Sequence, residues 1–262
     1  MDTMDSNEFD ISNNINIIHQ ADLNNAFEMI ENLIKNNVLG DEILLIFDLD
    51  GTLTDKPEPA LGIPVQAREN ALAFAQFAKT HGVNTFISSA WDIFAETLYR
   101  IDKLGLSELF LTTKANYLRK EIDDFIDTGA DKKAFKSMFS NVVLKSDSIL
   151  SEHLDLSKTI IGSADDQYSF ITINYCHLGN VVSVRDSDLG NFTPQFYRNK
   201  ALSPLVACPD LDYKKIKHVI FVEDSRHNIN YFVSDIQRLW KMGVMNFDPD
   251  VKIEVFELKI AG

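Results

Sequence analysis

The feature that most constrains the fold is the apolar run "ILLIF", residues 43–47, which is followed at once by "DLDGTLT". A short apolar run that ends abruptly in turn residues is typical of a fully buried strand in a parallel sheet. Asp48 and Asp50 follow this strand, and residues two apart in extended backbone point to the same side. The sequence therefore predicts that two carboxylates share a small volume at a sheet edge where ligands bind.

Such a pair of carboxylates needs a compensating charge, because close carboxylates repel each other unless one is protonated or a cation lies between them. Mg²⁺ is a hard ion that prefers carboxylate oxygens. Gly51 permits a tight turn beside a ligand, and Thr52 and Thr54 add hydroxyl donors. A simple Asp-Gly turn would explain Asp50 and Gly51, but it leaves the buried charge of Asp48 unexplained and so favours a functional site.

Length and charge limit the class of protein. The 262 residues can form one large α/β domain or one domain with an insertion. With 25 basic and 39 acidic residues the net charge is −14, which argues against general affinity for nucleic acid or anionic membranes. The two cysteines, Cys176 and Cys208, imply no disulfide framework and favour a reducing compartment, although a single bond between them stays open.

The chain begins "MDTMDSNEFD", which lacks the basic and apolar regions of a secretory signal. No apolar run approaches the roughly 20 residues of a membrane helix. We therefore expect a soluble cytoplasmic protein without a membrane span, or one exported by a route that needs no N-terminal signal.

Beyond the first 20 residues, which are polar and Asn-rich and suggest a flexible arm, strands and helices alternate. Asp22 is a suitable N-cap for a helix that Gly40 stops. Further strands are expected at 83–87, 108–113, 218–222 and 251–258, and further helices at 65–82, 91–104 and 228–242. This alternation predicts an α/β fold of three layers, a Rossmann-like parallel sheet with right-handed crossovers.

The alternation is interrupted between residues 114 and 199 by a long helical stretch and two alternating runs that predict a hairpin around 178–180. These 86 residues exceed the dozen or so that a crossover needs. We expect a small α/β lobe that borders the site. The expected division is a flexible arm at 1–20, a core at 21–113 and 200–262, and the lobe at 114–199.

Three predicted strands end in polar residues of complementary kinds, which are Asp48 and Asp50, Ser88 and Ser89, and Glu223 and Asp224. Neighbouring parallel strands would bring these ends together, and carboxylates with a hydroxyl and a metal suit phosphoryl transfer. Lys200 opens a short helical pattern and could supply a cation for a phosphate. Each element also has a simpler interpretation, in which the serines are turn residues, the acids cap a helix and the lysine is solvated.

The order of "FDLDGTLT", "FISS", "NKALSPLV" and "VIFVEDSRHNI" resembles the four motifs of the haloacid dehalogenase superfamily of phosphatases. The resemblance covers residues 43–113 and 200–258, and it puts the lobe in the position of that family's second cap type. It implies a core of that family's fold and a Mg²⁺-dependent phosphatase that forms an aspartyl-phosphate. The alternatives are an inactive fold kept as a binding module and an interaction protein recognised by its acidic surface, and the intact pair of aspartates speaks against the first.

The resemblance also implies roles for single residues. Asp48 matches the nucleophile, Asp50 the general acid and base, and Lys200 the lysine that screens the phosphate. Weaker candidates for that lysine are Lys214, Lys215 and Lys217. The implied phosphate-binding residues are Ser88, with Ser89 as its alternative, and Gly51, Thr52 and Lys200. The implied metal ligands are Asp48, Asp50 through its backbone carbonyl, Glu223, Asp224 and Asn228.

Two details of the motifs narrow these roles. The fourth motif departs from its commonest form because Glu223 replaces a glycine and Asn228 replaces an aspartate, which bears on metal affinity. Aspartate at position 50 favours phosphomonoester hydrolysis or phosphate transfer over carbon–halogen cleavage or ion pumping. The substrate is then a small phosphorylated metabolite if the lobe covers the site, or a phosphoprotein, including one with phosphotyrosine, if it does not.

Overall fold

The computed structural model describes residues 11–55, 66–89, 100–101, 104–110, 158–164, 167–173, 175–178, 180–184, 200–208, 210–241 and 243–259. Its main sheet has six parallel strands and an antiparallel edge strand. The order is β1 (Ile15–Ala21), β9 (Lys252–Leu258), β8 (His218–Glu223), β2 (Ile43–Phe47), β3 (Asn84–Ser89), β7 (Val181–Val184) and β6 (Tyr175–Leu178). The predicted α/β class with a parallel sheet is confirmed.

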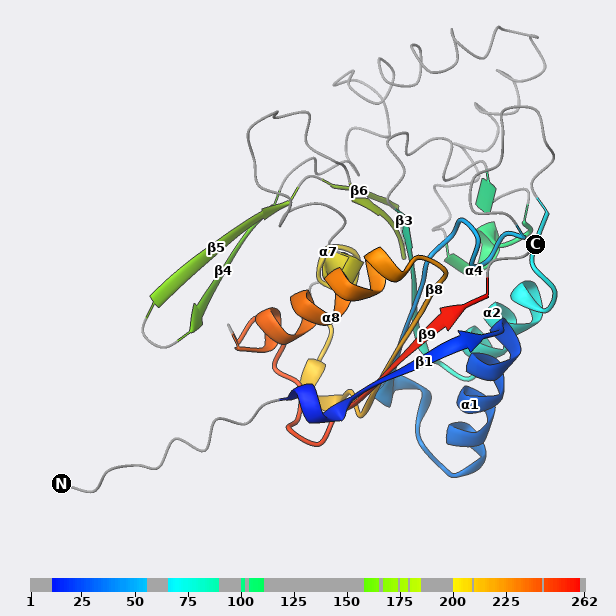
Figure 1. Ribbon diagram of the computed structural model, residues 1–262, viewed down its shortest axis with the longest axis horizontal. Coiled ribbons are helices and arrows are strands. Elements are labelled where there is room, and N and C mark those ends of the chain that lie inside the picture. The colour runs from blue at the N-terminus through cyan, green and yellow to red at the C-terminus, as the bar shows by residue number, and fades with distance from the viewer. Residues whose placement is uncertain are drawn as a thin grey trace, which may run out of the picture.

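Helices cover both faces of this sheet (Figure 1). Those on one face are α1 (Leu23–Lys35) and α2 (Ala71–Thr80), and those on the other are α7 (Ser203–Ala207) and α8 (Arg226–Lys241). Alternate residues of β2 enter the two cores, with Leu45 packed beneath α1 and α2 and Leu44 beneath α7 and α8. Because both faces of β2 are buried, its sequence is a continuous apolar run.

The α1 helix begins as the sequence predicts. The Asp22 side chain accepts a hydrogen bond from the Asn25 backbone N–H at 3.1 Å, and the Asn25 side chain accepts one from the Asp22 backbone at 2.8 Å. The helix ends at Lys35, before Gly40, which lies in the 3₁₀ turn η2 (Gly40–Glu42). A Cβ on Gly40 would lie 1.9 Å from the carbonyl oxygen of His81, so close packing rather than the helix end requires this glycine.

The expected flexible arm is wrong for residues 11–20. The 3₁₀ turn η1 (Ile11–Asn14) leads into β1, which pairs with β9 from Ile15 opposite Ile253 onward. Ile11 is buried, and Ile15 and Ile17 pack against the core beneath α8. The asparagines between these isoleucines obscured the alternation of an edge strand. Residues 1–10 lie outside the described residues.

The strand expected at 108–113 is also wrong where it is described, because Ser107–Phe110 forms the short helix α4. Leu106 and Phe110 are four residues apart and both are buried, which is helical spacing. Residues 111–113 lie outside the described residues. Among the described residues the helix expected at 91–104 is represented only by its last turn, in which Arg100 and Ile101 are helical.

The hairpin expected around 178–180 is confirmed, with Leu178 of β6 opposite Val181 of β7. It lies in the main sheet, since β7 pairs with β3, so this part of the expected lobe belongs to the sheet. A separate antiparallel pair, β4 (Lys158–Ala164) and β5 (Gln167–Ile173), lies beside α8 (Figure 1). Residues 114–157 lie outside the described residues, and the lobe as a unit stays a prediction.

No helix among the described residues is both long enough and apolar enough to cross a membrane.

Candidate functional site

The polar strand ends meet at the carboxyl edge of the sheet, as the sequence predicts. The strands β8, β2 and β3 are adjacent, and Phe47 lies opposite both Val222 and Ile87. Asp48 continues this alignment, because its N–H donates to the Val222 carbonyl at 3.0 Å. The terminal polar residues of the three strands therefore lie side by side at the carboxyl edge of the sheet.

Lys200 contacts two of the acidic groups at these strand ends. It begins the 3₁₀ turn η4 (Lys200–Leu202), and its ammonium donates to Asp48 Oδ1 and, at 2.6 Å, to Glu223 Oε2. The lysine and both acids are almost fully buried. The weaker candidates Lys214 and Lys215 lie in η5 (Tyr213–Lys215), and Lys217 directly precedes β8. All three therefore come before β8 and lie toward the opposite end of the sheet. Lys200 is thus the lysine at the acidic site.

Three carboxylates form one cluster, in which ligand atoms of Asp48, Glu223 and Asp224 all lie within 4.8 Å of one another. Three ionised carboxylates and one ammonium leave two negative charges, which a divalent hard cation can neutralise. The donor set therefore fits a metal ion. Asn228 donates to Glu223 Oε1 at 3.1 Å, so its amide orients a carboxylate of the cluster.

Burial changes the ionisation of this cluster. Burial and the nearby charge of Glu223 raise the pKa of Asp48 to about 7, although Lys200 opposes the change. Burial also raises the pKa of Glu223 and of Asp224. Burial disfavours the Lys200 ammonium, but the carboxylates of Asp48 and Glu223 outweigh it and raise the pKa of Lys200. The lysine stays charged, whereas burial shifts the three carboxyl groups toward their protonated forms.

The carboxylate of Asp50 has a different partner. Arg100 donates from a terminal guanidinium nitrogen to Asp50 Oδ1 at 2.5 Å, and the arginine side chain is 2% exposed. Burial raises the pKa of Asp50 to about 7, against the effect of the Arg100 charge. Sequence reasoning missed Arg100, because a single arginine in an amphipathic segment gives no sign that it faces inward.

The hydroxyl groups of Ser88 and Ser203 are paired. Ser203 Oγ donates to Ser88 Oγ at 2.7 Å, and both residues are fully buried. Successive residues of a strand face opposite sides, so Ser88 faces α7 with Phe86 and Ser89 faces α2 with Ile87. The geometry thus favours Ser88 over Ser89 as the serine near Lys200. Sequence reasoning missed Ser203, whose signal was its place before Pro204 at a helix start.

The turn after Asp50 is held by its own hydrogen bonds. Gly51 has a φ of 75°, and its N–H donates to Thr54 Oγ1 at 2.9 Å, so this N–H is engaged within the turn. Arg68, which the sequence also did not reveal, donates to the Gly51 carbonyl and at 3.3 Å to the Lys259 carbonyl. The Thr52 hydroxyl is buried and has no hydrogen-bond partner among the described residues.

Comparison of the chain with protein-family models, with curated proteins and with solved structures gives no match. The function is therefore inferred from the chemistry of the site itself. Its distinguishing elements are a buried acidic cluster, a buried lysine within it, and a second aspartate held by a buried arginine.

Proposed function

We propose that the protein is a Mg²⁺-dependent phosphatase that hydrolyses a phosphomonoester through an aspartyl-phosphate on Asp48, as in the haloacid dehalogenase superfamily. The observation that carries this proposal is the buried contact of Lys200 with Asp48 and Glu223 at the point where three strands end. Carboxylates and a lysine that converge at a ligand-binding edge suit phosphoryl transfer, in which catalysis is mainly positioning and charge neutralisation.

The energetic cost of the site supports a function. Burial of charged groups is expensive, and their mutual attraction repays the cost only in part. Leu44 and Leu45 of β2 lie in two clusters of buried hydrophobic side chains, which pack without this ion pair. Perturbed carboxyl groups that cluster at a strand edge are therefore better explained by chemistry than by stability.

In the first half of the reaction an oxygen of the Asp48 carboxylate attacks phosphorus. The bond from phosphorus to the ester oxygen breaks, and the leaving oxygen takes the proton of the Asp50 carboxyl group. Lys200 binds Asp48 Oδ1 and so fixes the orientation of the nucleophile. The products of this half are the free alcohol and the acyl phosphate on Asp48.

In the second half the Asp50 carboxylate removes a proton from water, and the water oxygen attacks phosphorus. The bond between phosphorus and the Asp48 oxygen breaks, which releases phosphate and restores the carboxylate. The paired hydroxyls of Ser88 and Ser203 are suited to bind a phosphoryl oxygen. Mg²⁺ held by Asp48, Glu223 and Asp224 would neutralise charge on the transferring group.

The test is phosphate release from an aryl phosphate in the presence of Mg²⁺, after a chelator, and after Mg²⁺ is restored. We expect release that stops with chelation and returns with the ion. Panels of phosphopeptides and of phosphorylated metabolites then assign the substrate class. Lys217→Met is the matched control for Lys200→Met, because Lys217 also pairs with a carboxylate but lies before β8, away from the proposed site. Absence of release from every panel, or release that chelation leaves unchanged, would contradict the proposal.

A further inference from the structure

Arg100 is a buried cation that the proposed reaction does not yet use. Its side chain is 2% exposed, and it contacts the Asp50 carboxylate, which is 15% exposed, at 2.5 Å. The two residues are 50 positions apart in the sequence, so the contact depends on the tertiary fold. Arginine is rarely buried without a specific partner, because removing its charge from water is costly.

The backbone that carries Asp50 is held independently of Arg100. Leu53 N–H donates to the Leu49 carbonyl at 3.0 Å, and Arg68 N–H donates to the Leu53 carbonyl at 2.8 Å. Gly51 adds its own bonds to Thr54 and to the Arg68 side chain. The turn therefore has other anchors, and the ion pair with Arg100 acts on the side chain of Asp50.

We propose that Arg100 is a positioning residue that fixes the Asp50 carboxyl group for proton transfer to the leaving oxygen. This inference rests on the proposed phosphatase function. As the proton moves to the ester oxygen and the bond to phosphorus breaks, Asp50 becomes a carboxylate. The adjacent guanidinium stabilises that developing charge without any rearrangement, since it already contacts Oδ1.

The consequence is a specificity for leaving groups. An alkyl phosphate releases a strongly basic oxygen, which needs the proton, whereas a nitrophenyl phosphate releases a stable anion that does not. Arg100 should therefore matter for alkyl phosphates and much less for activated aryl phosphates. A residue that only maintained the fold would affect both substrates equally.

The experiment compares kcat/KM for glycerol phosphate and for nitrophenyl phosphate, because this parameter covers only the steps up to departure of the leaving group. We expect Arg100→Met to lose about 100-fold or more on glycerol phosphate and less than about 10-fold on nitrophenyl phosphate, the range of general acid catalysis. Asp50→Asn should show the same pattern. The double variant should be no worse than Asp50→Asn, because the arginine acts through the aspartate.

Arg238→Met is the matched control, since Arg238 also pairs with a buried aspartate, at 3.0 Å, but on α8. It should leave the ratio of the two substrates unchanged. If Arg100→Met does not fold, Arg100→Lys supplies the comparison, because it keeps the charge but loses the fixed guanidinium geometry, and it should again lose more on glycerol phosphate than on nitrophenyl phosphate.

Equal losses on both substrates, or losses that add in the double variant, would overturn the inference while leaving the phosphatase function standing. The proposed function itself would be overturned if the wild-type protein hydrolysed neither of these two substrates and none of the phosphopeptides or phosphorylated metabolites in the panels.

Discussion

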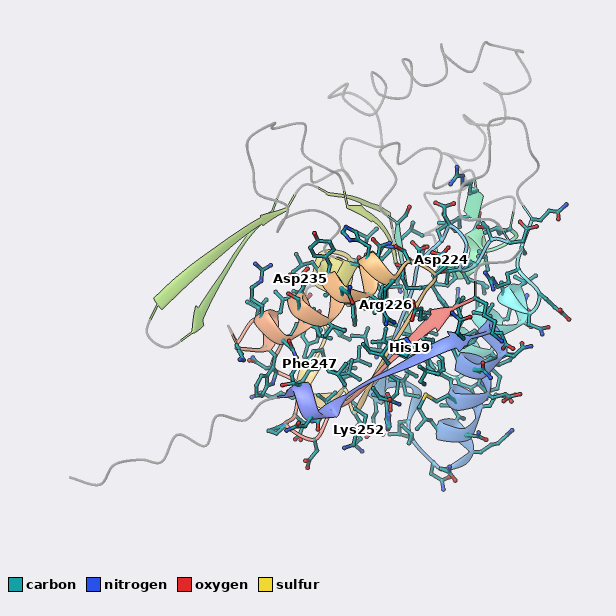
Figure 2. The ribbon with its side chains drawn as sticks, viewed as in Figure 1. His19, Asp224, Arg226, Asp235, Phe247 and Lys252 are labelled. Atoms are coloured by element: carbon teal, nitrogen blue, oxygen red, sulfur yellow. The ribbon has the colours of Figure 1, made fainter. Side chains whose placement is uncertain are left out.

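The two ends of β2 and β8 carry the same kinds of ion pair in opposite environments. Before the strands, Lys217 pairs with Glu42 at 2.5 Å and Lys215 pairs with Asp41. After the strands, Lys200 pairs with Asp48 and Glu223. Figure 2 shows these two ends, with Lys252 at the start of β9 and Asp224 beyond the end of β8. The lysine is 62% exposed in the Lys217 pair and 1% exposed in the Lys200 cluster.

Burial, rather than the identity of the partner, decides whether the pKa of the paired carboxyl group falls or rises. The hydrogen bond from Lys217 lowers the pKa of Glu42, whereas burial raises the pKa of Asp48 to about 7 despite its contact with Lys200. Exposed pairs are screened by water and contribute little to stability. Burial in the cluster disfavours the charged forms of the carboxyl groups, and the function we propose would use these perturbed groups.

The largest expected effect is that of Asp48→Asn at the carboxyl end. This change removes the proposed nucleophile, so turnover should fall on the order of 10⁴-fold or more. The melting temperature should change little, because one of several mutually repelling carboxylates is lost and Lys200 keeps Glu223. Phosphate release and calorimetry measure the two quantities. Wild-type turnover in this variant would rule out the aspartyl-phosphate.

Lys200→Met and Lys217→Met compare how much the buried lysine and the exposed lysine contribute to the unfolding free energy. Loss of Lys200 leaves a buried acidic cluster without its cation, which should cost about 3–5 kcal/mol of unfolding free energy. Loss of Lys217 should leave that free energy nearly unchanged, because its pair is exposed. Urea denaturation of both variants gives the values. Equal destabilisation by the two changes would show that burial does not make the ion pairs at the two ends of β2 and β8 different.

Mg²⁺ should stabilise the folded protein through the carboxyl end alone. An ion at 100 times its Kd adds about 2.7 kcal/mol to the unfolding free energy when it binds only the folded state. Asp224→Asn should lose this gain, because it removes one carboxylate of the cluster. Lys217→Met should keep it. Thermal melts with and without Mg²⁺ measure the effect, and an equal shift in Asp224→Asn would place the ion elsewhere.

Asp235 is a buried acid outside the cluster, and its effect is confined to a range of pH. It lies on α8 and is 4% exposed, and burial raises its pKa from the ordinary 3.8 to about 6, against the charge of Arg238. The folded protein thus holds this proton more tightly than the unfolded chain does. Asp235 therefore lowers stability as pH rises from about 3.8 to 6, by at most about 3 kcal/mol.

Asp235→Asn should remove that loss, so the variant should gain stability relative to the wild type at pH 7 but not at pH 3.5. Urea denaturation at both values measures the difference. A gain that is the same at the two pH values would contradict the assignment of the effect to this carboxyl group.

Local patterns were sufficient for much of the fold. The unbroken apolar run of β2 predicts a strand buried on both faces, and the acids and serines after three such strands predict their convergence. Asp22 marks the start of α1. These features depend on neighbouring residues, which is why sequence alone revealed them.

The features that sequence reasoning missed depend on distant partners. Exposed asparagines interrupt the apolar pattern at β1, so the strand was not predicted from the sequence. Its isoleucines are recognised as strand residues only from their pairing with β9. The place of β7 beside β3 joins segments almost a hundred residues apart, at Ile87 and Val181. Arg100 belongs to the site through its contact with Asp50, and Ser203 through its hydrogen bond to Ser88. The sequence around a single residue does not indicate a partner so far along the chain.

The most direct test of the central claim is to trap the phosphoryl group on Asp48. The Asp50→Asn variant should accumulate the intermediate from an aryl phosphate with Mg²⁺, because the leaving group needs no proton but the water attack needs a base. Mass spectrometry after acid quenching identifies the modified residue. We predict one phosphoryl group on Asp48, absent with chelator and absent in an Asp48→Asn background. Phosphate release accompanied by a phosphoryl group on another residue, or by none at all, would contradict the account.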